Sequence, residues 1–212
     1  MYKKYIKRLI DVVLAVSFLL AFWWLYFIVG VLVKLNLGSP IIFKQQRPGI
    51  NGEIFTIYKF RSMAPPKNLA IEWELIRQGK KKRSDFDGKR INKFGNFLRN
   101  SSLDEIPELW NVIRGDMSLV GPRPLIVDYL PLYSPEQARR HDIRPGITGW
   151  AQVNGRELIC WEEKFKLDVE YVDSYSFFGD MKILLLTIKN IIFREGVSPE
   201  GEVTTDDFRG NN

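Results

Sequence analysis

The 212-residue sequence contains a single cysteine, Cys160, and a single histidine, His141. One cysteine excludes a disulfide within the chain and fits a reducing compartment. Neither residue stands in a pattern typical of a nucleophile–base pair or of a metal site. The sequence also lacks internal repeats and the motifs of nucleic-acid-binding folds, so we expect no nucleic-acid partner.

Negative charge is the scarcer sign, with Asp+Glu 25 against Lys+Arg 31 and a formal net charge of +6. A moderately basic chain suits anionic partners such as lipid head groups or nucleotide phosphates. The length is that of one domain with room for a membrane element.

Proline and charge are both missing from Val12–Val33, a run of 22 residues in which only Ser17 and Gly30 are not apolar. About 20 apolar residues suffice to cross a bilayer, so we predict a membrane-inserted helix within residues 1–36. Lysines and arginines are about equally frequent before and after the run. This favours a re-entrant segment, with both ends of the run on the cytoplasmic side of the membrane. A spanning helix is the alternative, because a proline-free helix in lipid has little reason to bend. A bend would have to come from packing or from a hydrogen bond of Ser17.

Two β-forming segments follow, Ile41–Gln45 and Glu53–Phe60, with an Asn-Gly pair between them. This pattern predicts a β-hairpin. Residues 67–90 form a charged insertion that includes four consecutive basic residues. We interpret this basic run as a solvated loop, with contact to anionic lipid as the first alternative and nucleic-acid binding as a remote one.

Asp104 and Glu105 precede apolar residues with helical spacing. Ser102 and Glu105 match a capping box, although Asp104 could itself be the cap. At a helix N-terminus both carboxylates should be ionised at neutral pH. Acidic residues in a first turn are also ordinary caps, and this purely structural interpretation stays open.

The remaining chain predicts two further helices, Glu162–Tyr175 and Asp180–Arg194, and a polar, loosely ordered tail from Gly196. The second helix has a wide apolar face that we assign to the core, with contact to the membrane interface as the alternative.

Four blocks in order make the sequence resemble the bacterial sugar transferases, the monotopic phosphoglycosyl transferases. They are Lys59–Met63, Leu98–Val112, Gly115–Pro124 and Arg144–Arg156. The resemblance runs from about Lys7 to about Val197. It implies transfer of a sugar-1-phosphate from a UDP-sugar to a polyprenyl (undecaprenyl) phosphate at the cytoplasmic face of the bacterial inner membrane.

The resemblance also implies that Asp104 is a nucleophile that forms an acyl phosphate, and that Glu105 holds Mg²⁺. A carboxylate approaching a diphosphate needs neutralising charge, which Mg²⁺ and guanidinium groups supply. Two other hypotheses stay open: transfer through a ternary complex without a covalent intermediate, and a membrane-anchored assembly protein that is not an enzyme.

Basic and polar residues in the same blocks are candidates for substrate binding. Arg123 lies between two prolines, which favour an extended backbone and a fixed guanidinium fork. A surface or carboxylate-paired arginine is its ordinary alternative. The full set of candidates is Lys59, Arg61, Arg99, Arg123, Arg144, Gln152, Asn154 and Arg156.

We therefore expect a mainly helical α+β fold with a membrane-inserted N-terminal helix (1–36), a catalytic domain at the membrane surface (37–198) and a polar tail (199–212). The membrane segment lacks the Ser-Pro break common in the family. We expect the short form of the family, in which no multi-span segment precedes the catalytic region. The sugar, the pathway and the oligomeric state, a homo-oligomer included, are not determined by the sequence.

Overall fold

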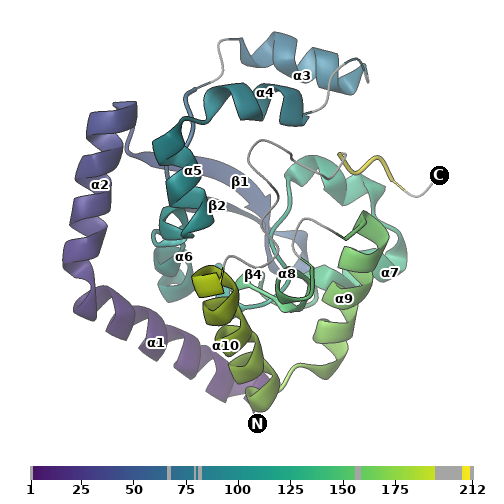
Figure 1. Cartoon of the computed structure of the whole chain (residues 1–212). Coiled ribbons are helices and arrows are strands. Elements are labelled where there is room, and N and C mark those ends of the chain that lie inside the picture. Colours follow the sequence, from purple (N-terminus) through teal and green to yellow (C-terminus); the bar gives the residue numbers. More distant parts are fainter. Residues whose placement is uncertain are drawn as a thin grey trace.

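The computed structural model describes residues 2–65, 68–78, 80, 83–155, 159–193 and 207–210. It confirms a mainly helical α+β protein (Figure 1). The helices are α1 (Lys7–Ala21), α2 (Trp23–Leu37), α3 (Leu69–Arg77), α4 (Arg83–Arg90), α5 (Lys93–Asn100), α6 (Glu108–Arg114), α7 (Pro135–Ala138), α8 (Trp150–Val153), α9 (Trp161–Ser174) and α10 (Phe177–Phe193). The strands are β1 (Ile42–Pro48), β2 (Ile54–Phe60), β3 (Ser118–Val120) and β4 (Gly146–Thr148). Short π or 3-10 turns occupy Tyr2–Ile6, Ile50–Gly52, Leu103–Glu105, Val127–Leu132 and Arg139–His141.

The strands form two separate pairs. β1 and β2 make the predicted antiparallel hairpin, with Ile42 opposite Phe60 at its open end. Asn51 and Gly52 both have positive φ, 54° and 76°, which explains the Asn-Gly signal at the turn. β3 and β4 pair in parallel, with Ser118 opposite Gly146, and bring two distant loops together.

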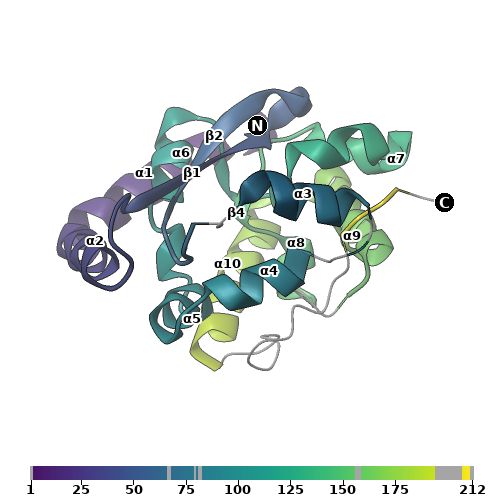
Figure 2. The same ribbon diagram turned by 90° about the horizontal axis from the view of Figure 1, so that it is seen from above.

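The described residues of the charged insertion form two helices, α3 and α4, on either side of the basic run 80–83. In that run Lys80 lies in a bend and Arg83 begins α4, whereas residues 81 and 82 lie outside the described residues, so the loop interpretation is wrong only at Arg83. Asn68 caps α3 by accepting a hydrogen bond from the backbone N–H of Ile71 at 3.3 Å. The Arg90 guanidinium of α4 bonds the carboxylate of Glu72 in α3 at 3.2 Å. α3 and α4 lie next to each other at one end of the molecule, at the top of Figure 1 (Figures 1 and 2). The charge pattern of the insertion does not by itself indicate this cap or this ion pair.

α1 and α2 form a sharply bent pair along one side of the molecule (Figure 1). Within the described residues no single helix is both long and apolar enough to cross a membrane; α1 and α2 qualify only together, and they are bent by 69°. The break is at Phe22, with φ −119° and ψ 25°, and not at Ser17. The carbonyl of Phe22 still accepts from the N–H of Leu25 and of Tyr26, at 3.0 and 3.3 Å. Most of the backbone bonding therefore continues through the bend.

Packing on the hairpin accounts for this bend without proline. Tyr26 of α2 lies against Phe60 of β2, with ring centroids 4.9 Å apart. Val29 and Val33 are buried in the same cluster as Ile57 and Phe60. α2 thus turns to bury one face against the hairpin, which a straight continuation of α1 would not reach.

The first turns of α1 are hydrogen-bonded to the rest of the chain. Asp11 accepts from the hydroxyl of Ser118 at 2.8 Å and from the N–H of Leu119 at 3.1 Å. Lys7 pairs with Asp180 of α10 at 2.6 Å. These contacts hold the start of the bent pair on β3 and α10.

Two expectations for the C-terminal third need correction. On α10, Ile183 is buried, but Leu185 and Ile192 are 68% and 67% exposed, so the apolar face is not a core face throughout. In the predicted loose tail, residues 207–210 are described, and Phe208 is only 6% exposed. The polar composition of the tail gave no indication that one of its aromatic side chains would be buried.

Candidate active site

The Asp104-Glu105 pair lies in a 3-10 turn between α5 and α6 rather than in the first turn of a helix. The predicted capping box is wrong, because Ser102 has a left-handed backbone with φ 55° and its side chain makes no cap bond. α6 begins only at Glu108. The left-handed residue reverses the chain after α5, so the pair stands on a turn ahead of the N-terminus of α6.

Asn111 fixes α6 to the hairpin. Its side chain is fully buried, donates to the carbonyl of Thr56 at 2.8 Å and accepts from the N–H of Tyr58 at 3.1 Å. It also donates to Asp116 at 3.1 Å. Because Thr56 and Tyr58 belong to β2, this amide sets the distance between the hairpin and the helix that follows the carboxylates.

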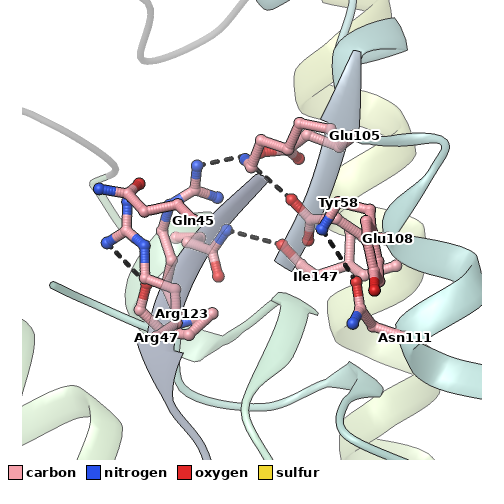
Figure 3. A network of polar contacts seen from close by, with 11 residues as sticks. Gln45, Arg47, Tyr58, Glu105, Glu108, Asn111, Arg123 and Ile147 are labelled. Carbon is pink, nitrogen blue, oxygen red and sulfur yellow. Dashed lines mark hydrogen bonds and ion pairs between the residues drawn. The ribbon is translucent and has the colours of Figure 1, made fainter. Parts of the chain in front are cut away.

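Four charged side chains from four segments meet at this turn: Lys59, Glu105, Glu108 and Arg123. Lys59 of β2 places its ammonium 2.8 Å from Oε1 of Glu105 and 2.8 Å from Oε1 of Glu108. Arg123 donates from Nη2 to the same Glu105 oxygen at 2.9 Å. Figure 3 shows Arg123 and Glu108 reaching this centre from opposite sides. The Arg123 side chain keeps 44% of its surface exposed, whereas that of Glu105 keeps 17%. The guanidinium therefore still offers donors to a bound anion.

The carboxyl groups differ sharply in acidity. Burial alone would raise the pKa of Glu105, but Lys59 and Arg123 outweigh it and hold that pKa at about 2. Burial and the neighbouring charge of Glu105 raise the pKa of Asp104 to about 6. Burial raises the pKa of Glu108 to about 7, in spite of Lys59. Both residues of the predicted pair are thus mainly anionic at pH 7, as expected, although Asp104 only narrowly.

Asp104 has no side-chain hydrogen bond or ion pair with any other described residue. This sets it apart from Glu105, although both belong to the same short turn. A nearly buried carboxylate whose pKa is raised and which has no protein partner is more reactive than one bound by two cations.

The carboxylates fit a hard divalent cation only together with further ligands. No group of three or more His, Cys, Asp or Glu side chains in the described chain could hold a metal ion by itself. Glu105 uses only Oε1 for Lys59 and Arg123, so Oε2 has no partner among the described residues. Mg²⁺ is typically bound by one or two carboxylates plus phosphate oxygens and water. Glu105 therefore suits Mg²⁺ brought with a phosphate substrate.

The backbone around Arg123 is held at successive carbonyls over residues 122–124. The guanidinium of Arg140 donates to the carbonyl of Arg123 at 2.8 Å. Arg47 donates to the next carbonyl at 3.3 Å, and the N–H of Gly146 to the preceding one at 3.0 Å. These side-chain and loop donors fix the position of the backbone from which the Arg123 side chain begins.

Comparison with known proteins shows the family. A family model described as bacterial sugar transferase matches residues 2–194. The chain belongs to the bacterial sugar transferase family. It is 47% identical over 206 residues to the uncharacterized sugar transferase EpsL of Bacillus subtilis, covering 97% of this chain and 96% of that protein.

Larger members of the family carry more specific names. The chain is 38% identical over 194 residues to the UDP-glucose:undecaprenyl-phosphate glucose-1-phosphate transferase of Xanthomonas campestris, and 37% identical over 191 residues to the protein of that name in Escherichia coli. These alignments cover 88% and 86% of this chain but only 38% and 39% of the relatives. The chain therefore spans well under half the length of these two sugar transferases.

Other predicted residues occupy different places in this sugar transferase. Arg61 is buried and donates to the carbonyls of Leu37 and, at 2.9 Å, Ser39, so it holds the turn after α2. Arg99 lies near Asp104, whose pKa its charge lowers, and approaches the sulfur of Met63 at 3.9 Å. Binding of substrate by Arg61 and Arg99 stays a prediction.

The predicted residues of segment 144–156, which contains β4 and α8, donate to backbone carbonyls. Arg144 donates to the carbonyl of Gly115 at 2.8 Å, Gln152 to that of Ile147 at 3.0 Å and Asn154 to that of Trp150 at 2.8 Å. Arg156 lies outside the described residues. The three described side chains therefore stabilise this segment of the backbone, and their binding of a substrate stays a prediction.

Sequence reasoning missed Glu108 and Arg140. Glu108 follows Glu105 by three residues, a spacing that places both on one helical face and could have identified it. Arg140 pairs with Asp168 and with the Arg123 carbonyl, both remote in sequence. No local pattern could have shown these partners.

Proposed function

We propose that this sugar transferase moves a sugar-1-phosphate from a UDP-sugar to a polyprenyl phosphate, through a covalent phosphosugar on Asp104. The observation that carries the proposal is the contrast within the turn: Asp104 has no protein partner in the described chain, while Glu105 is bound by Lys59 and Arg123. Relatives named as undecaprenyl-phosphate glucose-1-phosphate transferases support this donor and acceptor chemistry.

In the first step a carboxylate oxygen of Asp104 attacks the phosphorus that carries the sugar. The bond from that phosphorus to the bridging oxygen breaks, and UMP leaves with the electron pair. The product on the enzyme is an acyl phosphate. No proton has to be removed from Asp104 above its pKa of about 6.

In the second step an oxygen of the polyprenyl phosphate attacks the same phosphorus. The acyl–phosphate bond breaks, Asp104 is released as a carboxylate, and a polyprenyl diphosphate sugar forms. The attacking phosphate is already an anion, so this step also needs no strong base.

The cationic residues reduce the electrostatic repulsion between the Asp104 carboxylate and the substrate phosphates. Arg123 is half exposed and presents a guanidinium fork, which binds phosphate in a bidentate manner. Lys59 holds Glu105 and Glu108 in place beside it. Mg²⁺ bound by the free oxygen of Glu105 would supply further charge neutralisation at the diphosphate.

We infer a re-entrant arrangement for the bent pair α1–α2. Exposed aromatic side chains gather at the bend, where Trp23 and Trp24 are 68% and 47% exposed. Exposed aromatic and aliphatic surface of this kind suits lipid contact. Both ends of the pair return to the catalytic region, through Lys7 and Asp11 at one end and Val33 at the other. We therefore propose a protein of the bacterial inner membrane, and the basic residues on both flanks of the segment favour the cytoplasmic face for its catalytic residues.

Trapping the intermediate tests the reaction. Incubation of the membrane protein with UDP-sugar labelled in the sugar, without acceptor, should leave the label on Asp104, and later polyprenyl phosphate should remove it. UMP release without any labelled protein at single turnover would favour the ternary-complex mechanism. Absence of UMP release with a panel of UDP-sugars would leave the assembly-protein hypothesis. The matched control is Asp142→Asn, which changes an exposed aspartate just after the Arg139–His141 turn.

The re-entrant proposal has a separate test. A cysteine placed at residue 2 in a Cys160→Ser background should not react with a membrane-impermeant thiol reagent added to intact cells. Labelling from outside would show that the segment spans the membrane.

A further inference from the structure

Phe208, in the described segment 207–210, is seated in a pocket of four aromatic rings, with Leu125, Ile126 and Leu132 in the same cluster. Phe208 lies edge-on to Phe165 at 4.9 Å and to Tyr129 at 5.6 Å between ring centroids, and stacks on Tyr133 at 5.8 Å. Trp161 closes the pocket at 5.9 Å. The side chain of Phe208 is almost fully buried there.

Polar contacts fix the backbone of the same segment. The N–H of Phe208 donates to the hydroxyl of Tyr129 at 3.2 Å, and that hydroxyl donates to Asp207 at 3.4 Å. The segment is therefore held by directional contacts as well as by apolar burial. Such a fit is specific for one position of the ring.

Two rings of the pocket also contact the buried guanidinium of Arg140. Its central carbon lies 5.5 Å from the centroid of Phe165 and 5.7 Å from that of Tyr133. The Tyr133 hydroxyl accepts from Arg140 at 3.2 Å, and Asp168 accepts from it at 2.7 and 3.1 Å. Arg140 has no room to change its position independently of these rings, because its fork is bound on every side.

A second N–H of the Arg140 nitrogen Nη2, which also donates to Asp168, reaches the active site. Nη2 donates to the carbonyl of Arg123 at 2.8 Å, and the Arg123 side chain binds Glu105. A continuous set of contacts thus joins Phe208 to Glu105 through Tyr133, Arg140 and Arg123. Every contact in it is between groups packed against each other, which is the physical requirement for transmitted positional constraint.

We propose that Phe208 is a positioning residue for Arg123. Seated in its pocket, Phe208 presses the rings of Tyr133 and Phe165 against Arg140, and Arg140 holds the backbone from which the Arg123 guanidinium reaches the diphosphate. The inference rests on the proposed function, because it assumes that Arg123 binds the phosphates of a nucleotide sugar.

The test measures affinity for UDP, so that inactive variants can also be compared, together with the rate of UMP release and the midpoint of thermal unfolding. Phe208→Ala in the full-length chain should weaken UDP affinity by about 2- to 30-fold. Phe208→Leu, which keeps apolar bulk, should lose less. Tyr133→Phe removes only the hydroxyl that binds Arg140, and should shift UDP affinity in the same direction even if Phe208→Ala fails to fold.

Ile183→Ala is the matched control, since Ile183 is equally buried but belongs to the cluster around Tyr171. It should lower the unfolding midpoint and leave UDP affinity unchanged. A double variant separates positioning from general stability: in an Arg123→Lys background, Phe208→Ala should change UDP affinity by less than about twofold, because the residue it positions is already altered.

Unchanged UDP affinity in both Phe208→Leu and Tyr133→Phe would overturn the inference. It would also be overturned if Phe208→Ala weakened UDP affinity by the same factor in the Arg123→Lys background as in the unaltered protein. If the unaltered protein releases no UMP from any UDP-sugar, the proposed function fails, and this inference fails with it. An active unaltered protein with an equally active and equally tight-binding Phe208→Ala variant rejects the inference alone.

Discussion

Asp104 and Glu105 are neighbours in the chain, but their carboxyl groups have pKa values of about 6 and about 2. The two pKa values differ because the side chains point in different directions. The Glu105 carboxylate contacts Lys59 and Arg123, whereas the nearly buried Asp104 carboxylate is bonded to neither. Glu105 thereby stays anionic under all ordinary conditions, and its own charge helps to raise the pKa of Asp104. One carboxylate is fixed as a charge, and the other is left free to react.

The pH dependence of covalent labelling should therefore report Asp104. The reactive form is the anion, so the labelling rate should be constant well above pH 6 and fall about tenfold per pH unit well below it. Rapid-quench labelling with saturating UDP-sugar and Mg²⁺ measures this profile. Bound Mg²⁺ adds positive charge and should move the midpoint down, never up. A rate that increases on acidification would contradict the assignment.

Asp104→Asn should separate reactivity from folding. Removal of the nucleophile should lower turnover by about 10,000-fold or more. The free energy of unfolding at pH 8 should be unchanged or higher, by on the order of 1 kcal/mol, because the raised pKa of Asp104 means that its buried charge opposes folding above pH 6. Denaturation at pH 8 and at pH 4 checks the sign, since the advantage of the variant should disappear at pH 4. Large loss of stability would instead make Asp104 a structural residue.

Glu105→Gln should inactivate for a different reason. The amide oxygen is a weak metal ligand, and Lys59 and Arg123 lose the anion that they share. We expect the rate of UMP release to fall and to recover in part as Mg²⁺ is raised, with an increased apparent requirement for the metal. The Mg²⁺ titration of Asp142→Asn serves as reference. A rate that never responds to Mg²⁺ would remove Glu105 from the metal site.

Arg123→Lys should fold normally but bind and turn over poorly. An ammonium cannot reproduce the planar fork that contacts Glu105 and still faces solvent, so kcat/KM should fall about 100-fold. The thermal midpoint should change little, because the backbone at 123 is held through its carbonyl rather than its side chain. Kinetics within a factor of two of the unaltered protein would show that the fork is not used.

The hairpin and the carboxylate pair were predictable because their signals are local. Asn51-Gly52 requires two successive positive φ values, and few other turns use that pair. The conformation of Ser102 was not predictable, since Ser102 with Glu105 matches a capping box in sequence and only the path from α5 to α6 excludes it. Local and tertiary demands conflict at that residue, and the tertiary demand prevails.

The bend at Phe22 and the seat of Phe208 show the same limit at longer range. Tyr26 meets Phe60, and Phe208 meets Phe165, across separations that no periodic pattern encodes. A lone phenylalanine in a polar stretch and a proline-free apolar run are both compatible with several structures. Only the partner surface decides between them.

Asn111 has one more consequence, which concerns assembly. Its amide pairs the outward-facing N–H of Tyr58 and carbonyl of Thr56, the groups that an incoming strand would use to extend the hairpin at β2. The edge of this small sheet is therefore closed by a side chain, a protection against strand addition and aggregation. A second copy of the chain could add to β2 only by displacing α6, the helix that follows the reactive turn. Any association along that edge would be incompatible with an intact catalytic centre.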